Sequence, residues 1–448
     1  MSSSYHSSSL EDEDELVTTS TQQSWKMSKR KRYTPSSEDT ILDLDVQECG
    51  TFLKFWTDQW YSPIYACLRR LVHTKDIFAL MATCKHLYKS LNKSEWDIDR
   101  SLRRFVNNPV QFRDQLAFSD ALISGSFALQ FFERVVWHGT GLDIFVQGGI
   151  KAESLGQYLC VQQGYEMGEP VLATHWRNIA DEVQIRTYTR PNLGHLPDKV
   201  QIFQTKHAPL RSILLSSYTT ALVNIITPRA AFSIFPLLTF GRYKAFMLVQ
   251  LDDYYGEIML KYSKRGWITR DILWEDEQRP HLPIQKNRYV GDEFTWTVYF
   301  ETIHLTAPKP PEYVMRLSYF GMERRDDLIY GQYYEVTALR FCSCVLRHEY
   351  IMNKVSNYFW TNYIIDRLNR LTFLEFMKLK EEDRPTEFIQ YTEAARMSPK
   401  WHKERDVFNF PDTWTYFDDY LLEWWAAWHD DPAERSSDRL EGGWKKVQ

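Results

Sequence analysis

Cysteine is scarce in this 448-residue chain and is not spaced for metal binding. The six cysteines lie at positions 49, 67, 84, 160, 342 and 344, and only the last two are close together. Structural zinc sites use closely spaced pairs of cysteine or histidine ligands, so this pattern excludes a zinc ribbon. So few cysteines in so long a chain predict thiols in a reducing compartment rather than a disulfide framework.

The sequence also lacks a long hydrophobic run and an excess of charge of one sign. Its most apolar long window, residues 212–240, is interrupted by Pro228, Arg229 and Pro236, whereas a membrane-spanning helix needs about 20 apolar residues. The first residues, MSSSYHSSSLEDEDE, resemble neither a secretory signal nor a transit peptide. The net charge is -5, so a site for nucleic acid would have to be local. We expect an intracellular protein, cytoplasmic or nuclear, without a membrane partner.

Aromatic residues, in contrast, are abundant, at 15% of the chain, and the hydrophobic content of 44% predicts a folded protein of two or three domains. Residues 1–50 and 431–448 are polar and predict disordered tails. The run Lys29, Arg30, Lys31 and Arg32 is either a nuclear-import motif or a solvated group of charges.

Residues 51–106 predict a small helical module, because apolar residues recur three and four positions apart. The stripe consists of Ile64, Leu68, Leu71, Ile77, Leu80 and Leu87. Pro63, the run Lys75-Asp-Ile-Phe-Ala-Leu80 and Trp96 resemble an F-box, although the usual opening Leu-Pro-x-Glu is reduced to Ser62-Pro63-Ile64. The resemblance implies that the stripe docks on an adaptor subunit of a ubiquitin ligase. The alternative is that the stripe packs into the protein's own core.

Residues 107–300 predict an α/β domain with a mixed sheet, because short β-branched segments alternate with helical ones. The expected strands are 142–146, 183–188, 200–203, 246–251 and 296–300, and the expected helices are 128–134 and 210–226. Residues 301–430 predict a C-terminal region that becomes helical after position 350. An aromatic stripe across 414–428 either packs on the main domain or binds a partner. The expected fold class is therefore α+β.

Two segments of this domain resemble fungal proteins with a degenerate nucleotidyltransferase fold of the polymerase-β type. These are Ser124-Gly-Ser-Phe-Ala-Leu-Gln-Phe-Phe-Glu-Arg134 and Gly141-Leu-Asp-Ile-Phe-Val146. The similarity continues to Trp296 and covers about half of the chain. It implies that Gly125 and Ser126 form a turn between a strand and a helix, and that Asp143 lies on the next strand. Gly125, Ser126 and Asp143 are thus candidate remnants of a nucleotide site, and the alternative is a structural turn with serine as the helix cap.

Active members of that class carry Asp-x-Asp and a third acid, which together hold two Mg²⁺ ions. This chain has Gly141 at the first position, and the strand expected to supply the third acid offers Lys199 and Gln201. One carboxylate cannot hold two divalent ions, so we expect no catalysis, no metal and no cofactor. Asp181 or Glu182 could supply a displaced acid. The histidines at 138, 175, 195 and 207 lack the spacing of metal ligands.

Three functional hypotheses follow. The first is a non-catalytic interaction protein, an F-box-type substrate-recognition subunit of a ubiquitin ligase with a pseudo-nucleotidyltransferase domain that binds a protein substrate. The second is a nucleotidyltransferase with residual activity through Asp143 and a displaced acid. The third is a nucleotide-binding or RNA-binding module that uses the cleft without chemistry.

Overall fold

The computed structural model describes residues 64, 67–68, 71–173, 183–191, 198–250, 253–272, 284, 288–306, 315, 317–327, 331–353, 358–385 and 408–430. The predicted tails, the basic run Lys29–Arg32, the acids Asp181 and Glu182, and His175 and His195 lie outside these residues. In the part described, no helix is both long and apolar enough to span a membrane. The five cysteines that fall within it are thiols.

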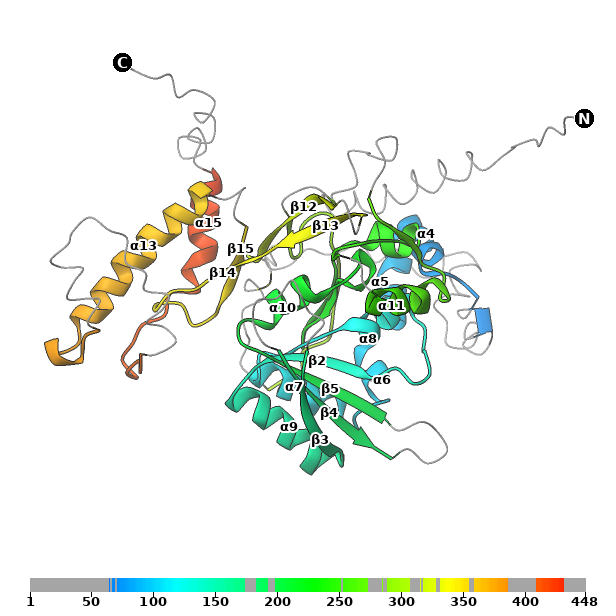
Figure 1. Ribbon diagram of the computed structural model, residues 1–448, viewed down its shortest axis with the longest axis horizontal. Coiled ribbons are helices and arrows are strands. Elements are labelled where there is room, and N and C mark those ends of the chain that lie inside the picture. The colour runs from blue at the N-terminus through cyan, green and yellow to red at the C-terminus, as the bar shows by residue number, and fades with distance from the viewer. Residues whose placement is uncertain are drawn as a thin grey trace, which may run out of the picture.

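An eight-stranded mixed sheet forms the centre of the molecule (Figure 1). Its spatial order is β11-β7-β6-β1-β2-β5-β4-β3, and only β2 and β5 pair in parallel. The strands are β1 Leu122–Ser124, β2 Leu142–Gln147, β3 Glu166–Leu172, β4 Gln184–Arg190, β5 Asp198–Thr205, β6 Asn224–Ile226, β7 Ala230–Ser233 and β11 Trp296–Tyr299. Smaller sheets contain β8 Lys244–Phe246, β9 Ile268–Arg270, β10 Arg288–Tyr289, β12 Tyr319–Asp327, β13 Gly331–Thr337, β14 Leu339–Phe341 and β15 Tyr350–Met352.

Helices precede the sheet, cover it and follow it. They are α4 Thr74–Thr83, α5 Lys85–Glu95, α6 Ile98–Leu102, α7 Pro109–Phe118, α8 Gly125–Glu133, α9 Ile150–Gln163, α10 Pro209–Ser216, α11 Asp253–Ser263, α13 Tyr358–Met377 and α15 Tyr420–Asp430. Short turns of other helix types are η4 Thr220–Leu222, η5 Leu237–Gly241 and η8 Glu381–Asp383. The mixed α+β class is as expected from the sequence.

Local side-chain chemistry sets several helix starts. The Asn108 side chain accepts a hydrogen bond from the Gln111 amide at 3.1 Å, and Pro109 occupies the first turn of α7, where its missing N–H is no loss. Asp97 caps α6 in the same way through the Arg100 amide at 3.0 Å. These polar residues mark helix starts that apolar periodicity alone does not locate.

Three sequence predictions were wrong in extent. The helix expected over 210–226 ends at Ser216, and Asn224–Ile226 forms β6, because pairing with β1 and β7 satisfies the backbone of this β-branched segment. The strand expected over 246–251 instead spans Lys244–Phe246, so it overlaps the expected range at Phe246 alone. The helical stripe expected from 414 begins at Tyr420, and Trp414 instead packs from a loop and donates a hydrogen bond to the Cys344 carbonyl.

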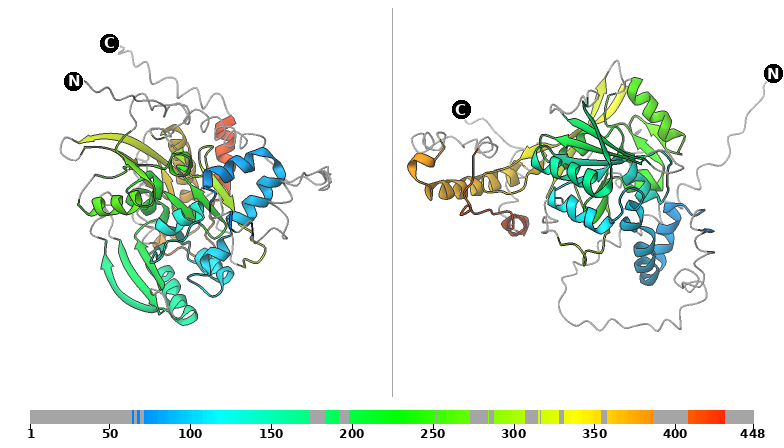
Figure 2. Two further views of the ribbon diagram at one scale, coloured as in Figure 1. Left: turned by 90° about the vertical axis from the view of Figure 1, so that its right-hand side faces the viewer. Right: turned by 90° about the horizontal axis from the view of Figure 1, so that it is seen from below.

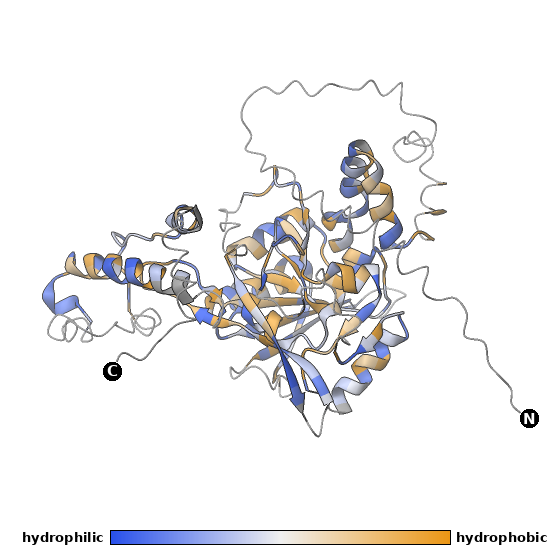
Figure 3. Cartoon of the chain, turned by 90° about the horizontal axis from the view of Figure 1, so that it is seen from above, coloured by the Kyte–Doolittle hydropathy of each residue, from blue (hydrophilic) through white to orange (hydrophobic). Residues whose placement is uncertain are grey.

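A separate hydrophobic cluster holds the C-terminal segments together. Trp360 on α13 lies 4.8 Å from Trp425 and 5.5 Å from Trp428 on α15, measured between ring centroids. Trp425 also lies 5.3 Å from Tyr319 of β12. Helix α13 projects away from the sheet (Figure 2), and it alternates hydrophobic and hydrophilic residues along its length (Figure 3). The aromatic stripe therefore covers α13 and its neighbours rather than the large sheet.

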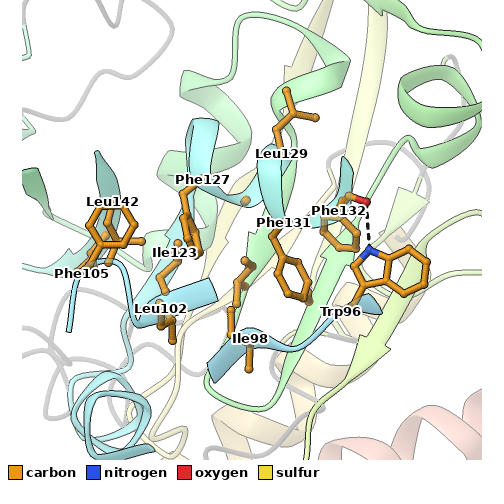
Figure 4. Close-up of a cluster of buried hydrophobic side chains, with 14 of the residues drawn as sticks. Trp96, Ile98, Leu102, Phe105, Ile123, Phe127, Leu129, Phe131, Phe132 and Leu142 are labelled. Atoms are coloured by element: carbon orange, nitrogen blue, oxygen red, sulfur yellow. Dashed lines mark hydrogen bonds between the residues drawn. The ribbon is translucent and has the colours of Figure 1, made fainter. Parts of the chain in front are cut away.

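The N-terminal helices and the sheet share one hydrophobic core. Trp96, Ile98 and Leu102 of the helical segment pack in the same cluster as Phe127 and Phe132 of α8 (Figure 4). The carbonyl of Phe132, near the C-terminal end of α8, accepts hydrogen bonds from Trp96 Nε1 at 3.0 Å and from the Thr74 hydroxyl at 3.4 Å. The last carbonyls of a helix have no partner within the helix, so the N-terminal segment supplies one.

A buried ion pair fixes the same junction. Arg134 Nη1 lies 2.6 Å from Glu95 Oε2, both side chains are almost fully buried, and Arg134 Nη2 donates to the Val72 carbonyl at 2.6 Å. Arg134 has a left-handed φ of 60° just after α8, a conformation that glycine adopts more easily. An arginine at this strained position therefore joins α8 to α5.

We predict that Arg134→Met lowers the free energy of unfolding by about 3 to 5 kcal/mol, because it leaves the Glu95 carboxylate buried without its partner. The double variant Arg134→Met/Glu95→Gln should recover a large part of the loss, and the exposed Arg103→Met should change little. Urea unfolding of the purified variants measures all three. A double variant as unstable as the single one would contradict this account.

Candidate functional site

The predicted strand, turn and helix form at Gly125. Strand β1 ends at Ser124, which pairs with Asp143 on the antiparallel β2, and α8 begins at Gly125. Gly125 has φ +70°, and a Cβ atom there would lie 2.4 Å from Oδ2 of Asp143. Only glycine fits this position, both because of its backbone conformation and because the carboxylate occupies the space of a side chain. Gly125 and Asp143 therefore lie together, as the sequence predicted.

The serine of the turn is not a helix cap. Ser124 is the cap residue by its backbone conformation, but its hydroxyl donates to the Asn224 carbonyl at 2.7 Å instead of accepting from the helix. Ser126 lies in the first turn of α8, and its side chain is hydrogen-bonded to Tyr262. The interpretation of Ser126 as a structural cap is therefore wrong, and both Ser126 and Asp143 interact with Tyr262.

The neighbouring positions do not provide further metal-binding carboxylates. The parallel pairing of β2 and β5 places Gln201 beside Asp143, and the Gln201 amide donates to the Thr187 hydroxyl at 3.3 Å. A Cβ atom at Gly141 would lie 2.8 Å from the carbonyl oxygen of Lys199, so the backbone leaves no room for an acid there. Among the described residues, no group of three or more His, Cys, Asp or Glu side chains could hold a metal ion.

Cations and tyrosines surround the one carboxylate. Burial raises the pKa of Asp143 to about 6, and the nearby Lys199 and Lys261 act in the opposite direction. Burial also raises the pKa of Tyr262 to about 12 and holds the pKa of Tyr218 well above its ordinary value, so both phenols stay protonated at neutral pH. The surroundings of Asp143 thus offer ammonium groups and hydroxyl donors rather than a ring of acids.

The end of helix α11 and the residues after it lie close to Asp143. Lys261 and Tyr262 end this helix, and Arg265 follows with its guanidinium 3.8 Å from the ring centroid of Trp137 and 5.4 Å from that of Tyr262. Burial lowers the pKa of Lys261, as does the neighbouring Arg265, whereas Asp143 raises it. The sequence analysis missed Lys261, Tyr262 and Arg265 as site residues. The available signal was the close spacing of basic and aromatic residues over 261–267.

The apolar stripe of the helical segment divides into two parts. Ile64, Leu68 and Leu71 are exposed, at 57%, 38% and 76% of their surface, whereas Ile77 and Leu87 are fully buried in the shared core. Leu80 is half-buried and packs against that core. The structure therefore separates the six residues into an exposed N-terminal group and a buried group.

Of the four histidines at 138, 175, 195 and 207, the structure describes His138 and His207. His207 Nδ1 lies 3.9 Å from Glu349 Oε2, and His138 is exposed in the segment after α8. Neither belongs to a group with metal-ligand composition among the described residues.

Comparison with known proteins identifies no family for this chain. No known family model matches the sequence, and a search of curated proteins finds no significantly similar one.

We predict that Asp143→Asn stabilises the protein at neutral pH. Because folding raises the pKa of this acid from 3.8 to about 6, its ionised form opposes folding above pH 6, and the penalty disappears as the pH falls to about 4. The free energy of unfolding should rise by about 1 to 3 kcal/mol at pH 7.5 and change little at pH 4.

Urea unfolding at both pH values measures this effect, with the exposed Glu166→Gln as the matched control. Destabilisation by Asp143→Asn at pH 7.5 would show instead that the native state depends on the ionised carboxylate.

Proposed function

We propose that this chain is a non-catalytic interaction protein whose large domain keeps a nucleotidyltransferase-like cleft without the acids that hold metal ions. The observation that carries the proposal is the close approach of Gly141 to the Lys199 carbonyl, which leaves no room for a side chain at the first acidic position. Gln201 beside Asp143 supports it. A residual transferase would need a displaced acid, and Asp181 and Glu182 lie outside the described residues.

The exposed part of the helical segment supports a docking role. Ile64, Leu68 and Leu71 present apolar side chains next to a segment whose Ile77 and Leu87 anchor it to the large domain. Exposed apolar side chains that are grouped in this way are typical of partner-binding surfaces. We propose that they contact an adaptor subunit of a cullin-RING ubiquitin ligase, so that the large domain presents a surface to a protein substrate.

Replacing the exposed leucines tests this docking role. Leu68→Asp and Leu71→Asp should each reduce recovery of the ligase with the tagged full-length protein by about tenfold or more, because loss of a buried anchor residue costs at least about 2 kcal/mol. Val161→Asp is the matched control, since Val161 is equally apolar and exposed on α9. Absence of the ligase from wild-type pull-downs, or unchanged recovery with folded variants, would refute the adaptor proposal.

The charge of the cleft favours a second candidate function, which is binding of a phosphate-bearing ligand such as a nucleotide or RNA without chemistry. Lys199 and Lys261 lie close enough to Asp143 to act on its pKa, and Lys261 and Arg265 interact electrostatically with each other. Asp143, on which Lys199 and Lys261 act, lies against Gly125 at the N-terminal end of α8, where backbone N–H groups also favour negative charge. A phosphate would be matched by these cations without a metal ion.

We predict that a nucleoside triphosphate binds without Mg²⁺ and is not turned over. Calorimetric titration should give about tenfold weaker binding for Lys261→Ala, because a hydrogen bond to a charged group contributes at least about 1.5 kcal/mol. The exposed Lys264→Ala is the control. Nucleotide transfer that requires Mg²⁺ or Mn²⁺ and disappears in Asp143→Ala would establish the residual enzyme instead.

A further inference from the structure

A second cavity lies at the opposite end of the same strands. Asp143 is near the start of β2, whereas Gln147 at its end lines a cavity of about 150 Å³, four residues or roughly 13 Å away along the strand. Because β1 runs antiparallel to β2, residues before β1 line the same cavity, namely Leu116, Ala117, Asp120 and Ala121. The segment between β14 and β15, including Arg347 and Glu349, closes another side.

The inner walls of this cavity are apolar. They are formed by buried side chains from α7, β1, α10, β7, β15 and the segment before β12, namely Leu116, Leu122, Leu210, Phe232, Ile351 and Met315. An engineered protein cavity of similar volume with an apolar lining holds a benzene molecule. The space therefore fits a ring-sized or short branched apolar group.

Charged side chains lie around the same cavity. Within the described lining, three basic residues, Lys151, Arg229 and Arg347, outnumber the two acids Asp120 and Glu349. Glu349 is already engaged, because Oε1 accepts from the Ala208 amide at 2.9 Å and Oε2 accepts from Arg340 Nε at 2.8 Å. Lys151 pairs with Asp120, and the Arg347 guanidinium lies 5.0 Å from the ring centroid of Tyr416, so the lining carries one more basic than acidic group and favours an anionic ligand.

His348, Gln147 and Arg347 contribute polar groups to the lining of the cavity. His348 lines it, and burial lowers the pKa of this histidine, so that it is neutral at pH 7 and adds no positive charge. Gln147 and Arg347 are exposed, which places the mouth of the cavity on their side.

The backbone at Asp120 is held in a conformation that an acid rarely adopts. Helix α7 ends with the Ala121 amide bonded to the Leu116 carbonyl at 2.9 Å and the Asp120 amide bonded to the Ala117 carbonyl at 3.3 Å. In this motif the residue with positive φ is usually glycine, but here it is Asp120, with φ 50°. Its carboxylate forms an ion pair with Lys151. Asp120, with its positive φ, thus holds Lys151 at the cavity wall through this ion pair.

We propose that this cavity binds a small monocarboxylate whose apolar part is about the size of a benzene ring. The apolar group would occupy the space between α7, β1 and β7, and the carboxylate would face the basic side chains near the mouth. An apolar pocket with a few converging polar groups is the common form of a small-molecule site.

Benzoate is the probe, with neutral benzamide and cationic benzylamine as matched comparisons. We expect ligand-observed NMR and calorimetry on the full chain to show saturable binding of benzoate, with binding of benzamide at least about tenfold weaker and none of benzylamine. Absence of benzoate binding at about 10 mM, or equal binding of benzoate and benzamide, would overturn the proposal.

Two variants test whether benzoate binds in this cavity. Arg347→Gln at the exposed rim should weaken benzoate about tenfold without changing benzamide, and Ala117→Leu, which fills the buried wall, should abolish binding of both. Arg370→Gln on the exposed face of α13 is the charge control. If Ala117→Leu does not fold, Arg347→Gln still decides, and unchanged benzoate binding in that variant would refute the site.

The phosphate cleft provides an independent comparison. Lys261→Ala should leave benzoate binding unchanged, and a loss in that variant would show that benzoate occupies the cleft at Asp143 instead.

Discussion

Burial of helix α8 on all sides is the constraint on which the rest of the structure depends. Every residue from Phe127 to Glu133 is buried, so the helix needs covering elements in every direction. The sheet covers one side, and the N-terminal helices cover another and bind the Phe132 carbonyl and Arg134. The N-terminal helical segment therefore shares the core of the large domain, whereas Ile64, Leu68 and Leu71 at its start are exposed.

A buried acid lies at each end of the same helix. Its N-terminal end lies against Asp143, whose surroundings are cationic and phenolic. Near its C-terminal end, Tyr243 donates to Glu133 at 2.6 Å, and burial raises the pKa of Glu133 to about 7. Buried acids of this kind cost stability, and proteins commonly carry that cost where a site requires it.

Strands β1 and β2 connect the two proposed binding sites. The cleft at Asp143 and the cavity at Gln147 occupy opposite ends of one short antiparallel pair, and each lies where the chain leaves a strand for a helix. Lysines and tyrosines surround Asp143, whereas the cavity is largely apolar with charges near its mouth. Their chemistry therefore favours different ligands, one phosphate-bearing and one a small carboxylate.

The sequence alone determined the features that depend on neighbours along the chain. The Gly125 turn and the strand that carries Asp143 follow from backbone freedom and β-branched residues, and both form. The F-box-like and nucleotidyltransferase-like assignments remain predictions. Only the tertiary structure decided that 224–226 is a strand, because its partners in β1 and β7 satisfy a backbone that would otherwise continue a helix.

The tertiary structure alone also decided what surrounds each site. Lys261 lies more than a hundred residues from Asp143 in sequence, and the cavity combines Leu116 with Ile351, so neither grouping has a local signal. Tertiary packing also determines which residues of the apolar stripe are buried. Ile64 and Ile77 follow the same helical periodicity, but Ile77 packs in the core around α8 whereas Ile64 is exposed. Periodicity states which residues share a face of a helix, whereas packing against distant elements determines whether that face is covered.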